Sequence, residues 1–274
     1  GTIEDLAVSP QEKKNFNLPV DMQKISNDKE CFLNVSYQLK NDEGLLTANT
    51  TVARQQIALT NYLWDKNIVK ATEKNTLKLD KKDKENLSFA SKQGVNISFN
   101  KKDGFLCRYQ VMGTSWLADG TELTPNFWRA GTDNDYGANL QNKYRVWMKP
   151  AMNLETLTQK TYKDSIVVNA SYDMPDVKGK LYLTYVLYEQ GTMTVRQRLV
   201  ADKTAKVPNM FRFGMRMQLP GSADLSEYYG RGPIENYIDR NNCTFVGKYV
   251  QTADEQFYSY IRPQENGNKT DIRW

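Results

Sequence analysis

The sequence predicts an all-β protein made of antiparallel sheets that pack face to face. Apolar residues recur at every second position in several stretches, and turn-forming residues separate these stretches. A sustained helical period is absent, and a short helical turn at 141–148 is the most that the pattern allows. Long strands with one apolar face and tight turns between them favour sheets stacked on each other.

The first strands are expected within 31–39 and 51–59. In the stretch 31–39 the odd positions are apolar and the even ones are mostly polar, and 41–44 then supplies turn residues. The region before residue 77 is short for an immunoglobulin-like sandwich, which usually has seven strands in about 100 residues. We therefore expect residues 1–76 to form a partial immunoglobulin-like β-sandwich that lacks its first strands.

A nearly all-charged segment follows, and the strand pattern resumes at Asn86. We expect 77–85 to be a charged linker and 86–274 to be a second, larger domain. The alternative for the segment is an exposed hairpin tip.

The second domain repeats the alternation in several more strands. The Asp103-Gly104 pair predicts a hairpin between a strand at 95–99 and a return strand at 105–111. Residues 181–187 and 193–199 alternate on either side of a turn at 189–191, and 211–219 reads as another half-buried strand.

Composition excludes several classes of function. The 274 residues carry 37 basic and 32 acidic side chains, and the net charge of +5 is spread along the chain, so we expect no nucleic-acid partner. No apolar run approaches the roughly 20 residues that cross a bilayer, so we expect no membrane partner. The chain has no histidine, which excludes Ser-His-Asp and Cys-His catalysis and most zinc sites.

The cysteines and the first residues say little about compartment. Cys31, Cys107 and Cys243 lie far apart, and their odd number argues against a disulfide framework. Cys31 and Cys107 stand in apolar runs, so we expect buried free thiols there. Residues 1–4 do not resemble a signal peptide, and we expect a cut within a longer protein. The cytoplasm and the periplasm of a bacterium both stay open.

Residues 127–137 look like neither a strand nor an ordinary turn. An aromatic pair precedes Arg129, and Asp133, Asn134, Asp135 and Gly137 follow. Such a loop can hydrogen-bond sugar hydroxyls, hold Ca²⁺ through oxygen atoms, or cap its own backbone. The spacing of an EF-hand is not met, which counts against calcium.

A second segment, 228–240, combines tyrosines with polar side chains. It includes Tyr229, Glu235, Asn236 and Tyr237 after a Gly-x-Gly-Pro turn. Aromatic faces stack on the C–H faces of sugars while carboxylates and amides read hydroxyls, so carbohydrate contact is one interpretation. A buried turn with an internal ion pair is the other. A third segment, 262–268, is read as a turn.

These three segments together resemble the C-terminal region of the large bacterial β-galactosidases. They are the stretches 127–137, 230–240 and 262–267, and they occur in the family's order. The resemblance covers essentially the whole chain. It implies that the first domain is the latter part of the family's immunoglobulin-like domain. The second would be most of a supersandwich related to galactose mutarotases.

The resemblance also implies a function. In that family two glutamates in an upstream TIM barrel hydrolyse terminal β-galactosides with retention, and this chain holds neither. It implies no catalytic residue and no cofactor in this chain, although Mg²⁺ is a candidate for the parent enzyme. The family's loop near the mouth of the active site matches the region after 133–137, with Gly137 as a natural hinge. The resemblance makes five residues candidates for this substrate rim: Arg129, Asp133, Asn134, Asp135 and Gly137.

The expected partners follow from the same comparison. They are the TIM-barrel domain of the same polypeptide and, through the intact enzyme, a β-galactoside; homo-oligomers stay open. Two rival interpretations are a stand-alone carbohydrate-binding module and a purely structural or assembly module. Mutarotase activity is disfavoured because the chain has no histidine to move protons.

Overall fold

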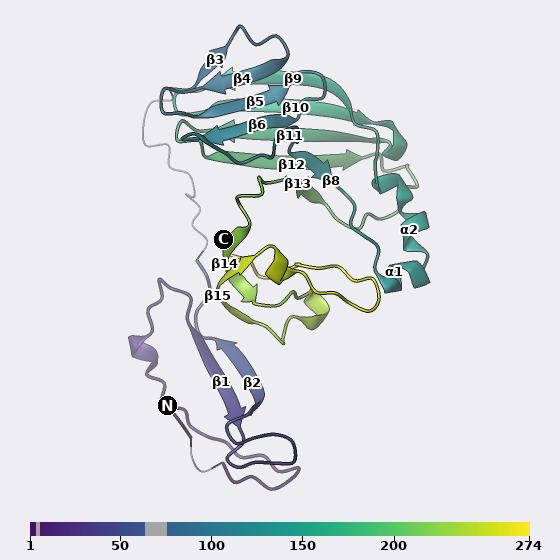
Figure 1. Ribbon diagram of the computed structural model, residues 1–274. Coiled ribbons are helices and arrows are strands. Elements are labelled where there is room, and N and C mark those ends of the chain that lie inside the picture. Colours follow the sequence, from purple (N-terminus) through teal and green to yellow (C-terminus); the bar gives the residue numbers. More distant parts are fainter. Residues whose placement is uncertain (4–5, 64–75) are drawn as a thin grey trace. The chain divides into compact units, whose positions relative to one another are not determined.

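The computed structural model describes residues 1–3, 6–63 and 76–274 (Figure 1). These residues divide into two compact units, Gly1–Asp65 and Lys66–Trp274. Antiparallel strands are the main regular structure, so the prediction of an all-β protein is confirmed. Among the described residues no helix has both the length and the apolar character that a membrane span requires.

In its described residues, the first unit contains one hairpin and a short 3₁₀ helix, η1 (Met22–Lys24). Strands β1 (Phe32–Gln38) and β2 (Thr51–Ala58) pair antiparallel, close to the two predicted ranges. Leu33 faces Ile57 and Tyr37 faces Ala53, which gathers apolar side chains on one face. No described side chain of this unit is buried, because a single hairpin cannot enclose a core.

The second unit is built on two large sheets (Figure 1). The five-stranded sheet has the order β3-β4-β5-β6-β7, with strands Lys78–Asp80, Asn86–Ala90, Asn96–Asn100, Leu106–Val111 and Thr114–Ser115. The four-stranded sheet has the order β12-β11-β10-β9; in chain order, β9 to β12 are Asn153–Thr161, Ile166–Met174, Gly179–Leu187 and Met193–Ala201.

The core lies between these two sheets. In β11 every second residue is buried, as the alternation at 181–187 predicted, and β10 follows the same rule. Phe99 of β5 and Tyr185 of β11 meet edge to face at 4.8 Å, and the ring of Phe105 stacks on Tyr172 of β10 at 5.3 Å. The predicted face-to-face packing is therefore present in this unit.

The charged segment 77–85 is a hairpin rather than a linker. Leu77 is buried in the core of the second unit, and β3 pairs with β4. The Asp83 carboxylate accepts hydrogen bonds from the N–H groups of Glu85 and Asn86 and from the Ser88 hydroxyl, which closes the turn. Most of the charges face solvent, while Leu77 and the partly buried Leu79 pack against the core, so charge density alone was misleading.

The strand expected at 211–219 is much shorter. Only β13 (Gly214–Arg216) forms, paired with β8 (Thr124–Asn126). Before it, Phe211 packs edge to face with Trp128 at 4.8 Å and with Tyr144 at 5.1 Å. These contacts draw the residue away from the ladder that its alternation predicted.

Short helices and one further hairpin complete the second unit. The hairpin pairs β14 (Leu225–Gly232) with β15 (Phe245–Thr252). The helices are α1 (Asp133–Gly137), α2 (Leu140–Lys143), η2 (Arg145–Trp147), η3 (Pro175–Val177), η4 (Ile238–Arg240) and η5 (Asp254–Gln256). The helical turn expected at 141–148 corresponds to α2 and η2.

The expectation of buried thiols is wrong in degree. Cys31 and Cys107 are free but only half-buried, and Cys243 is free and exposed. Cys107 lies in β6, where its thiol donates to the Ser98 carbonyl at 3.4 Å. Burial raises the pKa of the Cys107 thiol, which disfavours the reactive thiolate.

Candidate functional site

The segment 127–137 folds into a capped helical turn. Thr132 is the N-cap of α1, and its hydroxyl accepts a hydrogen bond from the Asp135 N–H at 3.4 Å. The Asp135 carboxylate in turn accepts the Thr132 N–H at 2.8 Å. This reciprocal capping box explains why a Thr-x-x-Asp sequence begins a helix here, a signal that the strand analysis did not use.

Arg129 holds the buried carboxylate of Asp135. The guanidinium donates to both oxygens of that carboxylate, at 2.5 and 3.2 Å, and lies 4.6 Å above the ring of Phe211. Burial alone raises the pKa of the Asp135 carboxyl. The hydrogen bonds from Arg129 and Thr132 outweigh that effect, and the pKa lies below its ordinary value. Asp135 is therefore a charged anchor inside the chain.

The other predicted residues of this segment are more accessible. Asp133 receives a hydrogen bond from Arg262 at 3.3 Å, and its N–H donates to the Pro263 carbonyl at 2.8 Å. Asn134 is exposed on α1. Gly137 is exposed at the end of the helix, outside the left-handed region, and a methyl group added there would meet nothing within 4 Å. Its backbone conformation is thus one that any residue can adopt.

The second segment forms a hydrogen-bond network with residues 267–270. Asn236 is fully buried, and its amide donates to the carbonyls of Arg231 and Ile234 while its oxygen accepts from Thr270. Glu235 is also buried, accepts the Gly267 N–H at 3.3 Å and pairs with Arg240 at 3.4 Å. These groups use their hydrogen-bonding capacity within the chain, as the buried-turn interpretation expects.

The two predicted tyrosines have different surroundings. The Tyr237 hydroxyl donates to the Glu265 carbonyl at 2.9 Å, and burial, with Glu265 and Glu235 nearby, raises its pKa to about 12. Tyr229 lies on β14, where its N–H donates to Trp274 and its carbonyl accepts from Arg273.

The three motif segments meet at Glu265. Its carboxylate pairs with Arg212 and lies 3.7 Å from the Arg129 guanidinium, while its carbonyl accepts from Tyr237. The sequence analysis interpreted 262–268 as a turn and 211–219 as a strand, and so did not identify Glu265 or Arg212 as part of this junction. The sequence showed only that the three motifs occur in one chain, and it did not show which of their residues are in contact.

The donor set does not suit a divalent cation. Arg129 occupies both oxygens of Asp135, and the Asp133 carboxylate already faces Arg262. Within the described ranges, no group of three or more cysteine, aspartate and glutamate side chains is placed to hold a metal ion. This segment is therefore better suited to hydrogen bonding than to calcium.

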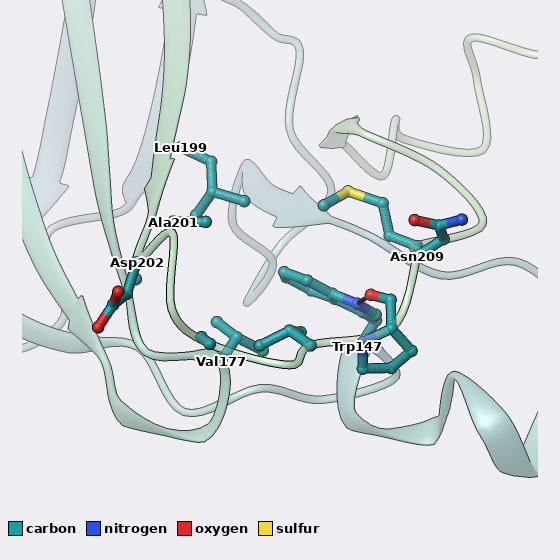
Figure 2. A pocket seen from close by; sticks show the side chains of 11 residues that line it. Trp147, Val177, Leu199, Ala201, Asp202 and Asn209 are labelled. Carbon is teal, nitrogen blue, oxygen red and sulfur yellow. Dashed lines mark hydrogen bonds between the residues drawn. The ribbon is translucent and has the colours of Figure 1, made fainter.

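The clearest pocket lies elsewhere in the second unit. It has a volume of about 470 Å³ beside the ends of β11 and β12, and Figure 2 shows Trp147, Val177 and Leu199 on its walls with Asp202 and Asn209 at other positions around it. The Trp147 indole N–H donates to the Pro208 carbonyl at 2.7 Å. None of the nine predicted site residues is among those that line it.

Comparison with known proteins shows the family to which the chain is related. A family model described as beta galactosidase small chain matches residues 91–274, and one described as beta-galactosidase, domain 4, matches residues 1–60. A beta-galactosidase of Priestia megaterium is 30% identical over 274 residues, which cover 98% of this chain and 26% of that protein. One of Lactobacillus delbrueckii subsp. bulgaricus is 32% identical over 65% of this chain and 18% of its own length.

A third relative, a beta-galactosidase of Actinobacillus pleuropneumoniae, is 25% identical over 96% of this chain and 26% of its own length. The chain thus spans about a quarter of the length of the relatives that it matches throughout. The three motif segments that meet at Glu265 all lie within the part matched by the small-chain family. The chain therefore belongs to the beta-galactosidase small chain family.

Proposed function

We propose that this chain is the accessory C-terminal region of a retaining β-galactosidase that hydrolyses terminal β-galactosides. It completes one rim of the sugar site, and the catalytic glutamates lie upstream in a TIM barrel of the same polypeptide. The observation that carries the proposal is the convergence of the three family motifs at Glu265, beside α1. That convergence leaves Asn134 exposed and Asp133 partly exposed on a well-anchored turn.

The state of the acidic side chains supports a non-catalytic role. Glu235 and Glu265, the glutamates of the converging segments, are both paired with arginines. A retaining glycosidase needs two carboxyl groups about 5 Å apart on either side of the scissile bond, one of which must deliver a proton. Glutamates tied into internal ion pairs suit the support of a loop better than that task.

The test is β-galactosidase activity of this isolated chain and of the full-length enzyme that contains it. In the full-length enzyme, Asp135→Ala removes the anchor of α1, and Gly137→Ala stiffens its end without a steric clash. Asp119→Ala is the matched control, because that carboxylate is exposed and lies outside the motif segments. We expect an inactive chain and a changed kcat or KM in the two loop variants only.

The outcomes separate the candidate functions. Activity in the isolated chain would overturn the accessory role, since a catalytic pair would have to lie within it. An inactive chain whose full-length loop variants keep unaltered kinetics would favour the second candidate, a purely structural or assembly module. One observation favours that candidate. The polar side-chain groups of Asp135, Glu235 and Asn236 form hydrogen bonds within the chain.

A further inference from the structure

Glu265 occupies the junction of the three motif segments. Its side chain is only 15% exposed, and its two carboxylate oxygens face different arginines. One oxygen accepts from Arg212, and the other lies 3.7 Å from Nε of Arg129. The backbone carbonyl of Glu265 accepts the Tyr237 hydroxyl at 2.9 Å, which fixes the position of the residue from a third direction.

Arg129 links Glu265 to α1. The same guanidinium that faces Glu265 donates two hydrogen bonds to Asp135, the third residue of the helix. Its plane also lies over the ring of Phe211, 4.6 Å from the centroid. A planar guanidinium can meet all three partners at once because its donors point in fixed directions.

The segment that contains Glu265 also touches the first residue of α1. The Pro263 carbonyl accepts the Asp133 N–H at 2.8 Å, and Arg262 lies 3.3 Å from the Asp133 carboxylate. Residues 262–265 therefore contact the helix directly at its start and, through Arg129, at its third residue.

The charges in this junction balance. Arg129 and Arg212 carry two positive charges, and Asp135 and Glu265 carry two negative charges. Loss of the Glu265 charge would leave Arg212 without its carboxylate and Arg129 with Asp135 alone. The side chains of Arg129 and Glu265 are only 20% and 15% exposed, whereas Arg212 is 41% exposed. Loss of the Glu265 charge is therefore felt mainly at Arg129, because a shielded charge that loses its partner stays poorly solvated.

We infer that Glu265 is a positioning residue for the substrate-rim segment. By orienting Arg129 it sets where α1 presents Asp133 and Asn134 to the sugar. This inference rests on the proposed function, since it assumes that α1 lies at the rim. Glu265 acts through Arg129 and not on the substrate, so its loss should alter substrate affinity more than the chemical step.

The experiment measures KM and kcat of the full-length enzyme with a nitrophenyl β-galactoside. Glu265→Gln removes the charge and keeps the shape, and Glu265→Asp keeps the charge. Glu227→Gln is the matched control, because Glu227 forms an ion pair with Lys248 on the β14–β15 hairpin, away from the junction. Thermal unfolding of each variant is recorded beside its kinetics.

We expect Glu265→Gln to lower kcat/KM about tenfold, chiefly through KM, because displacing a binding group weakens the ground state and the transition state alike. Glu265→Asp should recover most of the loss, and Glu227→Gln should stay near wild type. In the 274-residue chain, Glu265→Gln should also speed hydrogen exchange at the amides of Asp133, Tyr136 and Ala138, whose N–H groups bond within this region.

A Glu265→Gln enzyme that is folded and has wild-type KM would overturn the inference, even if its melting temperature fell. If the Gln variant fails to accumulate, Arg129→Lys decides by the same criterion, because a lysine ammonium lacks the fixed fork of donors with which Arg129 meets both Asp135 and Glu265. Asp135→Ala separates the two proposals. Altered kinetics in Asp135→Ala with a silent Glu265→Gln would keep the rim function and remove the positioning role. Silence in both would remove the rim function as well.

Discussion

Phe99 of β5 lies edge to face against Tyr185 of β11, with ring centroids 4.8 Å apart, and this contact joins the two large sheets across the core. Both side chains are fully shielded from solvent. Edge-to-face pairs add about 0.5–1.5 kcal/mol to the stabilisation that burial gives. The scaffold that carries the motif segments therefore depends on contacts far from them.

Replacing Phe99 by alanine should destabilise the second unit strongly. Phe→Ala substitutions in a packed core cost about 3–5 kcal/mol, because buried area is lost and a cavity remains. Urea denaturation followed by circular dichroism measures the change. Phe257→Ala is the control, since that side chain is 68% exposed, and it should shift the midpoint little. A small change for Phe99→Ala would mean that the two sheets do not share a core.

Asn236→Ala should lower the free energy of unfolding, because Asn236 supports the fold and does not bind a ligand. The buried amide bonds to backbone groups of Arg231, Ile234 and Thr270 in part-buried contacts, so its loss leaves these groups without that partner. Each such group costs about 1–3 kcal/mol, and we expect a total loss of about 3 kcal/mol or more. Asn134→Ala, at an exposed position, should stay within about 0.5 kcal/mol. Equal stability of the two variants in chemical denaturation would contradict the claim that the hydrogen bonds of Asn236 stabilise the fold.

The charged hairpin should respond to acid. The Ser88 hydroxyl and the Asn86 N–H, with weaker help from other donors, lower the pKa of Asp83 from 3.8 to about 2. Because the folded-state pKa lies below the ordinary value, this interaction stabilises the folded state above about pH 4 and is lost as pH falls toward 2. A carboxyl titration by NMR should show the pKa of Asp83 rising toward 3.8 in Ser88→Ala. An unchanged pKa would contradict the assigned cause.

Two glycines should respond in opposite ways to alanine. Gly104 has φ +77°, and an added methyl group would lie 2.6 Å from the Tyr172 hydroxyl, so Gly104→Ala should cost about 2 kcal/mol. Gly137→Ala meets no neighbour and should stabilise the helix end by about 0.5 kcal/mol. Thermal unfolding distinguishes them. Destabilisation by Gly137→Ala would reveal a conformation there that only glycine adopts.

The predictions from sequence succeeded where burial follows a simple period. Strand β11 alternates between buried and half-buried residues because its two faces meet different surroundings, and that contrast is written in the sequence. The Asp-Gly pair at 103–104 likewise marks a real turn, since Gly104 has a positive φ. Local chemistry was enough in both cases.

The predictions from sequence were wrong where contacts between residues far apart in the chain determine the local structure. Phe211 and Arg212 follow a strand pattern, but Trp128 and Glu265 draw them into tertiary contacts. The segment 77–85 reads as a linker because its one buried anchor, Leu77, is outnumbered by charges. For the site, the sequence identified the motifs and their order. It did not reveal the contact between Arg129 and Glu265, because these residues are more than a hundred positions apart and no local pattern links them.

The first unit, whose described residues bury no side chain, has a consequence for calorimetry. The heat-capacity change of unfolding comes from apolar surface that the folded state hides from water. A hairpin with open faces hides little, so the described residues of the first unit should add almost nothing to the heat-capacity change of unfolding. A calorimetric scan of the whole chain should then show a heat-capacity step that matches the second unit alone.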